Sequence, residues 1–62
     1  DGMVLYNVGC ICSLLGRLDE AIEVLERAVR HGLTHQGWFA HDSNLDPLRG
    51  TPRFENLLQQ LA

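Results

Sequence analysis

The sequence contains no lysine: its five basic residues are all arginines, and eight acidic residues outnumber them to give a net charge of −3. The arginines are scattered among the acids, so the basic stripe typical of nucleic-acid-binding proteins is missing. No apolar run reaches the ~18 residues of a membrane-spanning helix, and the basic start of a signal peptide is also absent. We therefore expect neither a nucleic-acid partner nor a membrane partner.

Cysteine is also scarce, with only Cys10 and Cys12, one residue apart. On a helix these two side chains point roughly 200° apart, which rules out a disulfide bond between them. Their spacing differs from that of redox and zinc motifs. We interpret both as small buried apolar residues, and two unpaired thiols favour a reducing, cytoplasmic compartment.

A chain of 62 residues is small for an independent domain. Such a chain buries only about 60% of the surface that its unfolded form exposes, and natural domains of this size usually add disulfides, a metal or a partner. The chain begins at Asp1 without an initiator methionine, so we expect it to be a fragment of a longer protein.

Residues 3–15 are almost all apolar, and Gly16 follows them directly. The run is longer than a typical strand and ends at a glycine suited to a left-handed C-terminal cap, which favours a helix. Because this helix is apolar nearly all round, we expect it to be covered on more than one side.

A second helix is predicted from Asp19 to Gly32, with Asp19 capping its first turn. Its apolar residues recur at spacings of three and four, so that they form one stripe on an amphipathic helix. They are Leu18, Ala21, Ile22, Leu25, Ala28 and Val29.

Residues 34–44 are rich in turn-forming residues and are predicted to be mainly loop. Within them, Trp38 and Phe39 are expected to fold back against the helices, and the alternative is an exposed aromatic hot spot for a partner. The dipeptides Asp46-Pro47 and Thr51-Pro52 each place a capping side chain before a proline.

The first of these dipeptides predicts a single turn that ends at Gly50, and the second predicts a third helix. Four residues of this helix are spaced at i, i+3, i+4 and i+7 and are expected to pack on the second helix. They are Phe54, Leu57, Leu58 and Leu61.

The first two helices together resemble a tetratricopeptide repeat, a helix–turn–helix unit of about 34 residues with a spaced pattern of small and large residues. The matching positions are Leu5, Val8, Gly9, Cys12, Gly16, Leu18, Ala21, Leu25 and Ala28. Gly9 and Ala21 are small where the helices would cross. The chain departs from the family pattern at three positions, with Leu5 for tryptophan, Cys12 for tyrosine and Leu33 for the closing proline.

The segment 45–54 is similar to segments that close tetratricopeptide arrays in multidomain bacterial proteins such as regulatory kinases and cyclases. Any such catalytic activity would belong to other domains. We therefore predict an all-α fold in which residues 3–33 form one repeat-like hairpin. Residues 34–62 would add a loop, a short turn and a capping helix.

The resemblance implies a protein–protein interaction module that is not an enzyme and needs no cofactor. Because one repeat cannot bury its apolar surface alone, it would be the terminal repeat of an array or a self-associating repeat. Its partner would be a protein or peptide, neighbouring repeats, or a second copy that forms a homodimer. The groove-facing positions carried over from the family are Met3, Tyr6, Asn7, Cys10, Ser13 and Leu14, and Tyr6, Cys10 and Leu14 could instead be stacking surface for a neighbour.

A rival hypothesis is a small metal-binding or enzyme-associated domain that uses three histidines. His31 and His35 are four residues apart, which on a continuous helix would place both on one face as zinc ligands often are. Gly32 interrupts that helix, however, and His41 lies beside Asp42 further along the chain. Solvated loop histidines are the alternative interpretation.

Overall fold

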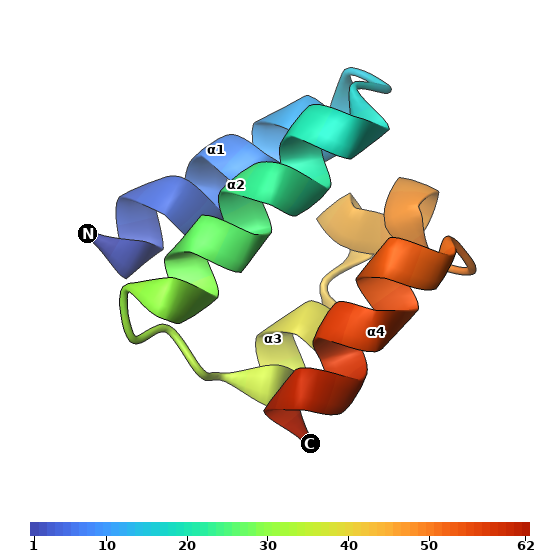
Figure 1. Ribbon diagram of the computed structural model, residues 1–62. Helices are drawn as coiled ribbons and strands as arrows, with labels where there is room; N and C mark the ends of the chain where they lie inside the picture. Colours follow the sequence, from blue (N-terminus) through green and yellow to red (C-terminus); the bar gives the residue numbers. More distant parts are fainter.

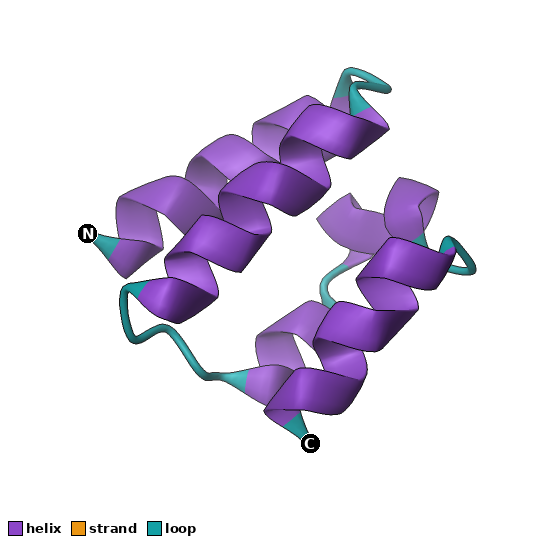
Figure 2. Ribbon diagram, in the orientation of Figure 1, coloured by secondary structure: helices purple, strands orange, loops and turns teal.

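A computed structural model describes all 62 residues as an all-α structure without strands, as the sequence predicts (Figure 1, Figure 2). It contains four α-helices and one 3₁₀ segment. In chain order they are α1 (Gly2–Leu14), α2 (Leu18–Arg30), α3 (Gln36–His41), the 3₁₀ helix η1 (Ser43–Leu48) and α4 (Pro52–Leu61).

Helices α1 and α2 lie side by side as an antiparallel hairpin joined by a tight turn (Figure 1). Gly16 has a φ of +79°, a conformation that L side chains adopt only with strain. The backbone N–H of Arg17 then donates to the carbonyl oxygen of Cys12 at 2.9 Å, which closes the end of α1. The predicted turn at Gly16 is confirmed.

The two helices approach most closely at Gly9. A Cβ atom placed on Gly9 would lie 2.6 Å from Cδ2 of Leu25, well inside van der Waals contact. Ala21 on the opposing helix is fully buried. The prediction that these small residues mark the crossing is therefore confirmed.

The N-terminus of α1 is capped by a side chain, whereas the N-terminus of α2 differs from the prediction. Asp1 caps α1, since its carboxylate Oδ1 accepts from the N–H of Met3 at 2.7 Å. Helix α2, however, begins at Leu18 after Arg17, so Asp19 lies inside the first turn and caps nothing. The predicted Asp19 cap is wrong because the short turn at Gly16 starts the helix one residue earlier than expected. Asp19 still carries negative charge at the positive end of the helix dipole.

Residues 34–44 are not mainly loop: α3 occupies residues 36–41. The local sequence is a weak helix former because it contains Gly37, and tertiary packing decides its conformation. Phe39 is fully buried in the core, and the Tyr6 ring meets it edge-on at 5.2 Å between centroids.

A short turn precedes Gly50 as predicted, and Gly50 has a φ of +86°. This turn, η1, begins at Ser43 with Asp42 as its cap, so the predicted Asp46 cap before Pro47 is wrong. Thr51 precedes Pro52 but makes no capping hydrogen bond.

Segments α3, η1 and α4 form a second layer beneath the hairpin (Figure 1). Phe54 and Leu57 of α4 are buried, and Leu58 and Leu61 are partly buried, so the predicted apolar face of this helix packs inward. At its start, Arg53 forms two hydrogen bonds with the carboxylate of Glu26 on α2, at 3.1 and 2.6 Å.

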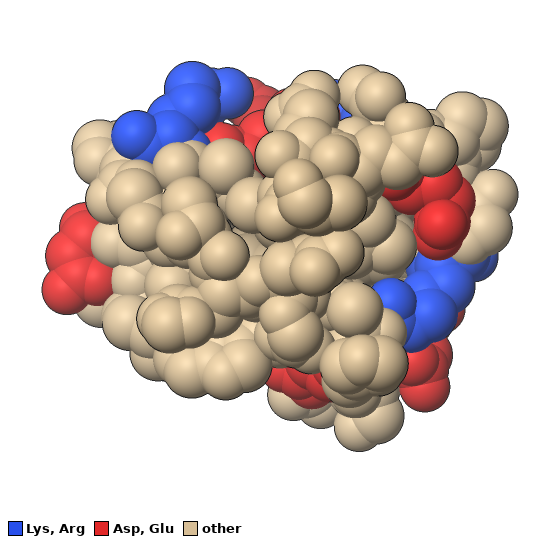
Figure 3. All heavy atoms as spheres, turned by 90° about the horizontal axis from the view of Figure 1, so that it is seen from below, with Lys and Arg blue, Asp and Glu red and all other residues tan.

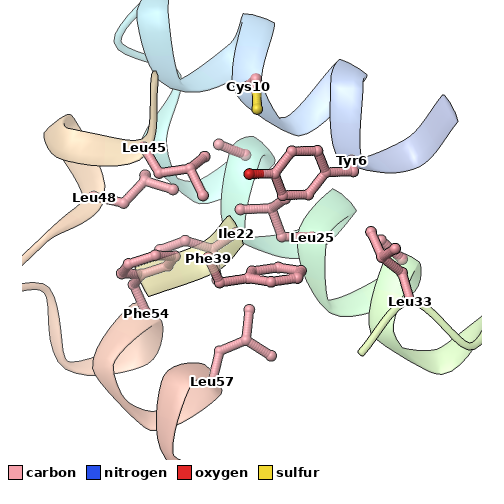
Figure 4. Packing of buried hydrophobic residues seen from close by; sticks show 12 residues of the cluster. Tyr6, Cys10, Ile22, Leu25, Leu33, Phe39, Leu45, Leu48, Phe54 and Leu57 are labelled. Atoms are coloured by element: carbon pink, nitrogen blue, oxygen red, sulfur yellow. The ribbon is translucent and has the colours of Figure 1, made fainter. Parts of the chain in front are cut away.

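One apolar cluster of 12 buried residues connects the two layers. Figure 4 shows side chains from every helical segment pointing into it. Its members are Tyr6, Cys10, Ala21, Ile22, Leu25, Ala28, Leu33, Phe39, Leu45, Leu48, Phe54 and Leu57. The C-terminal segments are thus part of the core and not an appendage to the hairpin.

Candidate protein interaction site

Helix α1 has three faces with different surroundings. One face, which includes Gly9, packs against α2. A second face carries Tyr6, Cys10 and Ser13, and these residues are buried under the C-terminal layer, where η1 lies against α1. The third face is open to solvent. The expectation that α1 is covered on more than one side is met by two layers of the same chain, and they leave this third face uncovered.

The open face is apolar and carries no charge. Six large apolar side chains on it are 41–67% exposed: Met3, Val4, Val8, Ile11, Leu14 and Leu15. Asn7 is exposed among them, and all seven lie within an arc of about 140° at 100° per residue. No Asp, Glu, Lys or Arg occurs in residues 2–16. Contiguous apolar patches of this kind are typical of interaction surfaces in soluble proteins.

The six groove positions expected from the resemblance are divided between two environments. Met3, Asn7 and Leu14 are exposed and belong to the open face. Tyr6, Cys10 and Ser13 are buried, so their expected exposure to a separate peptide is corrected. The physical reason is that the chain's own α3 and η1 cover this side of α1.

A hydrogen-bonded cluster joins α1 to the end of α3. The Tyr6 hydroxyl donates to Oδ2 of Asp42 at 2.6 Å, and the Cys10 thiol lies 3.8 Å from the same oxygen. The backbone N–H of Asn44 donates to Oδ1 of Asp42 at 2.9 Å, so Asp42 also caps η1. Figure 4 shows Tyr6 and Cys10 on α1, with the Tyr6 hydroxyl oxygen in red.

Arg49 stabilises the same corner of the molecule from the other side. Its guanidinium donates to the carbonyl oxygens of Phe39 at 3.1 Å and of Asp42 at 2.9 Å. It also lies 5.7 Å from the ring centroid of Phe54, within the range of a cation–π contact. Arg49 therefore ties α3, η1 and α4 together through backbone atoms and an aromatic ring.

The cluster shifts the ionisation of its members. The hydrogen bond from Tyr6 lowers the pKa of Asp42, so this carboxylate is ionised at neutral pH. Desolvation by burial raises the pKa of the Tyr6 hydroxyl, and burial likewise raises the pKa of the Cys10 thiol. A raised thiol pKa opposes thiolate formation, so the cluster favours a structural role over a nucleophilic one.

The two aromatic residues predicted to fold back together have different environments. Phe39 is buried, as predicted, but Trp38 is 42% exposed, so for Trp38 the prediction is wrong. The Trp38 ring stacks on His35 with centroids 4.7 Å apart and contacts the Tyr6 ring at 5.7 Å. Successive residues of a helix point about 100° apart, and on α3 this rotation directs Phe39 into the core and leaves Trp38 at the surface.

An open hollow of about 360 Å³ lies beside Trp38. It is lined by Gly37, Trp38, His41 and Asp42, all from α3 and its C-terminal residue. The sequence does not predict this feature, because residues 34–44 are rich in turn-forming residues and indicate a loop. The i, i+4 spacing of Trp38 and Asp42 would have placed them on one side of a helix.

The three histidines do not come together. His31 ends α2, His35 stacks on Trp38, and His41 lines the hollow. No group of three or more His, Cys, Asp or Glu side chains is arranged to hold a metal ion. The metal-binding hypothesis therefore receives no support from the geometry.

Comparison of the chain with protein-family models, with curated proteins and with solved structures yields no match. None of the helices combines the length and the apolar character required to span a membrane.

Proposed function

We propose that the chain is a protein–protein interaction module, a tetratricopeptide-like repeat that ends a helical array or self-associates. In this proposal the open face of α1 packs against a second helical hairpin. The exposed side chains of Val4, Ile11 and Leu15, all more than half exposed, are the observation that carries it. Burying apolar surface stabilises an interface by about 25 cal/mol per Å² before the costs of association.

The distribution of charge supports a partner on the α1 side of the molecule. The exposed side of α2 carries Glu20, Glu23, Arg27 and Arg30, which favour contact with water. The C-terminal layer covers the remaining side of the hairpin with Phe54 and Leu57. A chain with one open apolar face and a covered opposite side fits the terminal position of a stack.

The uncharged character of the open face also limits the chemistry of its partner. An apolar helix surface complements it, whereas a charged partner would lose hydration without gaining an ion pair. A hairpin of the same kind, either a preceding repeat or a second copy, meets this requirement. The two free thiols, Cys10 and Cys12, support a reducing, cytoplasmic location for the module.

Light scattering on the 62-residue chain tests the proposal, because a second copy is the only partner in the sample. We expect the mass to rise from monomer toward dimer as the concentration increases. Ile11→Lys places a charge in the middle of the open face and should return the chain to a monomer. Gln60→Lys adds the same charge at an exposed position of α4 and should leave the association unchanged.

A wild-type chain that remains monomeric at high concentration, with no binding of a hydrophobic dye, would contradict the proposal. So would equal association of the Ile11→Lys and wild-type chains. Thermal unfolding of each variant checks that the fold is retained.

A further inference from the structure

The hollow beside Trp38 combines three properties that do not follow from packing alone. The first is its shape. Gly37 and His41 are one helical turn apart on α3, as are Trp38 and Asp42, and together they line the depression. Gly37 leaves the space empty, since a Cβ atom built on it meets no atom within 4 Å.

The second property is an ionised carboxylate that forms no ion pair. The side chain of Asp42 accepts hydrogen bonds only from neutral groups, which are Tyr6, Cys10 and Asn44. Arg49, the nearby basic residue, reaches the Asp42 backbone carbonyl and forms its ion pair with Asp46. The other ion pairs, Arg17–Glu20 and Arg53–Glu26, do not include Asp42.

The third property is an exposed aromatic ring next to this carboxylate. Trp38 has the indole ring that binds cations best among aromatic side chains, and His35 already stacks on it. Trp38 and Asp42 line the same depression, and an indole ring and a carboxylate attract a positive charge by two independent mechanisms.

None of the four residues that line the hollow is an arginine or a lysine. Residues 31–41 and 56–62 contain no Asp, Glu, Lys or Arg. Figure 3, which views the molecule from the side of α3 and the C-terminus, shows a broad uncharged area with charged side chains at its edges. The nearest basic side chain, Arg49, pairs with Asp46 and hydrogen-bonds the Asp42 backbone, so no ion pair occupies the Asp42 carboxylate itself.

We propose that this hollow binds a basic side chain of a partner polypeptide, an arginine guanidinium or a lysine ammonium group, between Trp38 and Asp42. The cation stacks on the indole ring and pairs with the free electron pairs of the Asp42 carboxylate. The proposal deepens the interaction function, because it adds a charge-selective contact to the apolar contact made by α1. An anionic or purely apolar ligand would leave the carboxylate unpaired.

Fluorescence of Trp38, the only tryptophan of the chain, provides a direct readout. We would titrate the wild-type chain with the blocked tripeptides N-acetyl-Gly-Arg-Gly-amide and N-acetyl-Gly-Lys-Gly-amide at low ionic strength. A saturable change in Trp38 emission is expected for both peptides, and the change should weaken as salt is added. The same peptide with glutamine at its centre is the neutral control and should give no saturable change.

Three variants separate binding from folding. Asp42→Asn keeps an oxygen acceptor for the Tyr6 hydroxyl but removes the charge, and should weaken binding about tenfold. Gly37→Leu fills the hollow and should abolish binding. Gln36→Leu adds the same side chain to the same helix outside the hollow and should bind like the wild type.

Equal emission changes with the glutamine and arginine peptides would overturn the proposal, as would unchanged binding by a folded Gly37→Leu variant. The test of the cation site can be distinguished from the test of association through α1. A monomer that binds the arginine peptide contradicts only the association through α1, and a dimer that does not bind it contradicts only the cation site.

Discussion

The hydroxyl group of Tyr6 donates a hydrogen bond to the Asp42 carboxylate at 2.6 Å, although the two residues are 36 positions apart in the chain. Tyr6 lies in the middle of α1, and Asp42 both ends α3 and caps η1. This hydrogen bond therefore fixes the hairpin to the C-terminal layer at the point where that layer changes direction.

Removing the hydroxyl should loosen this attachment. Tyr6→Phe keeps the ring contacts with Phe39 and Trp38 but removes the donor to a charged acceptor, a bond that contributes about 1.5–3 kcal/mol. We expect the free energy of unfolding in urea to fall by about 2 kcal/mol. A double-mutant cycle with Asp42→Asn should show coupling between the two changes, and purely additive effects would show that the bond contributes nothing specific.

Stability should fall in acid. The pKa of Asp42 is lowered in the folded state by the hydrogen bond from Tyr6, so its stabilising contribution is present above the unfolded pKa of about 3.9. It is lost as the pH falls below about 4 and through the lower folded pKa. The pKa of Glu26 is lowered by Arg53 and adds to the same change. Urea unfolding at a series of pH values should give a smaller acid effect for Asp42→Asn than for the wild type.

Stability should also fall in alkali, for the opposite reason. Burial raises the pKa of Tyr6 and of Cys10 in the folded state, so folding favours their protonated forms. Their contribution is complete below the unfolded pKa values, near 9 for the thiol and 10 for the hydroxyl, and decreases as the pH rises beyond them. Tyr6→Phe should have a shallower alkaline decrease, and a wild-type curve that stays flat to pH 11 would refute this prediction.

The helix crossing at Gly9 should tolerate no side chain. Gly9→Ala would bring a methyl group to 2.6 Å from Cδ2 of Leu25, so the hairpin must open or Leu25 must move. We expect destabilisation by about 1–3 kcal/mol from overpacking. Gly37→Ala is the matched control: it is also a helical glycine but has open space around it, and should stabilise the chain by about 0.5–1 kcal/mol. Equal effects at the two positions would contradict the close approach.

Ser13 is a second residue, besides Gly37, at which substitution should increase stability. Its hydroxyl oxygen is completely buried and has no hydrogen-bond partner, which costs about 1–3 kcal/mol of desolvation. Ser13→Ala removes this group with almost no change in volume, so the melting midpoint should rise. Ser43→Ala, at an exposed position, is the control and should change the free energy of unfolding by less than about 0.5 kcal/mol.

Truncating a buried apolar side chain should lower the free energy of unfolding, whereas truncating a side chain on the open face of α1 should weaken association. Phe54→Ala removes a fully buried ring from the centre of the core, and a loss of about 3–5 kcal/mol would unfold much of a chain this small. Ile11→Ala should leave the monomer nearly as stable and instead weaken self-association seen by light scattering. If Ile11→Ala reduced the monomer's stability as much as Phe54→Ala, the α1 face could not be open.

The local sequence predicted the elements that depend on a strong pattern. The apolar run of residues 3–15, the three- and four-residue spacing of Leu18 to Val29, and the Thr51-Pro52 start each led to a helix that the structure contains. Gly16 marked the hairpin turn, because only glycine adopts its backbone conformation without strain. The short helix α3 was missed, because Gly37 weakens the local signal and the burial of Phe39 supplies the stabilisation.

The candidate site was only partly predictable. The apolar run predicts that α1 has too much apolar surface for one neighbour to cover, and Val4, Ile11 and Leu15 are exposed in the structure. The run alone does not indicate which side of α1 stays open. The residues of α1 buried under the C-terminal layer are Tyr6, Cys10 and Ser13, and most of its exposed residues are at least as apolar. Residue type alone therefore does not distinguish the buried side of α1 from the open side.

By itself, then, the sequence determined an all-α chain with one small-residue crossing and an apolar first helix, since helical periodicity and glycine positions are local properties. The tertiary structure decided which two sides of that helix are covered. It also decided that Asp42 meets Tyr6 and that Trp38 stays at the surface. These outcomes depend on where the chain returns in space after Gly32, and contacts between residues more than thirty positions apart leave no periodic signal in either segment.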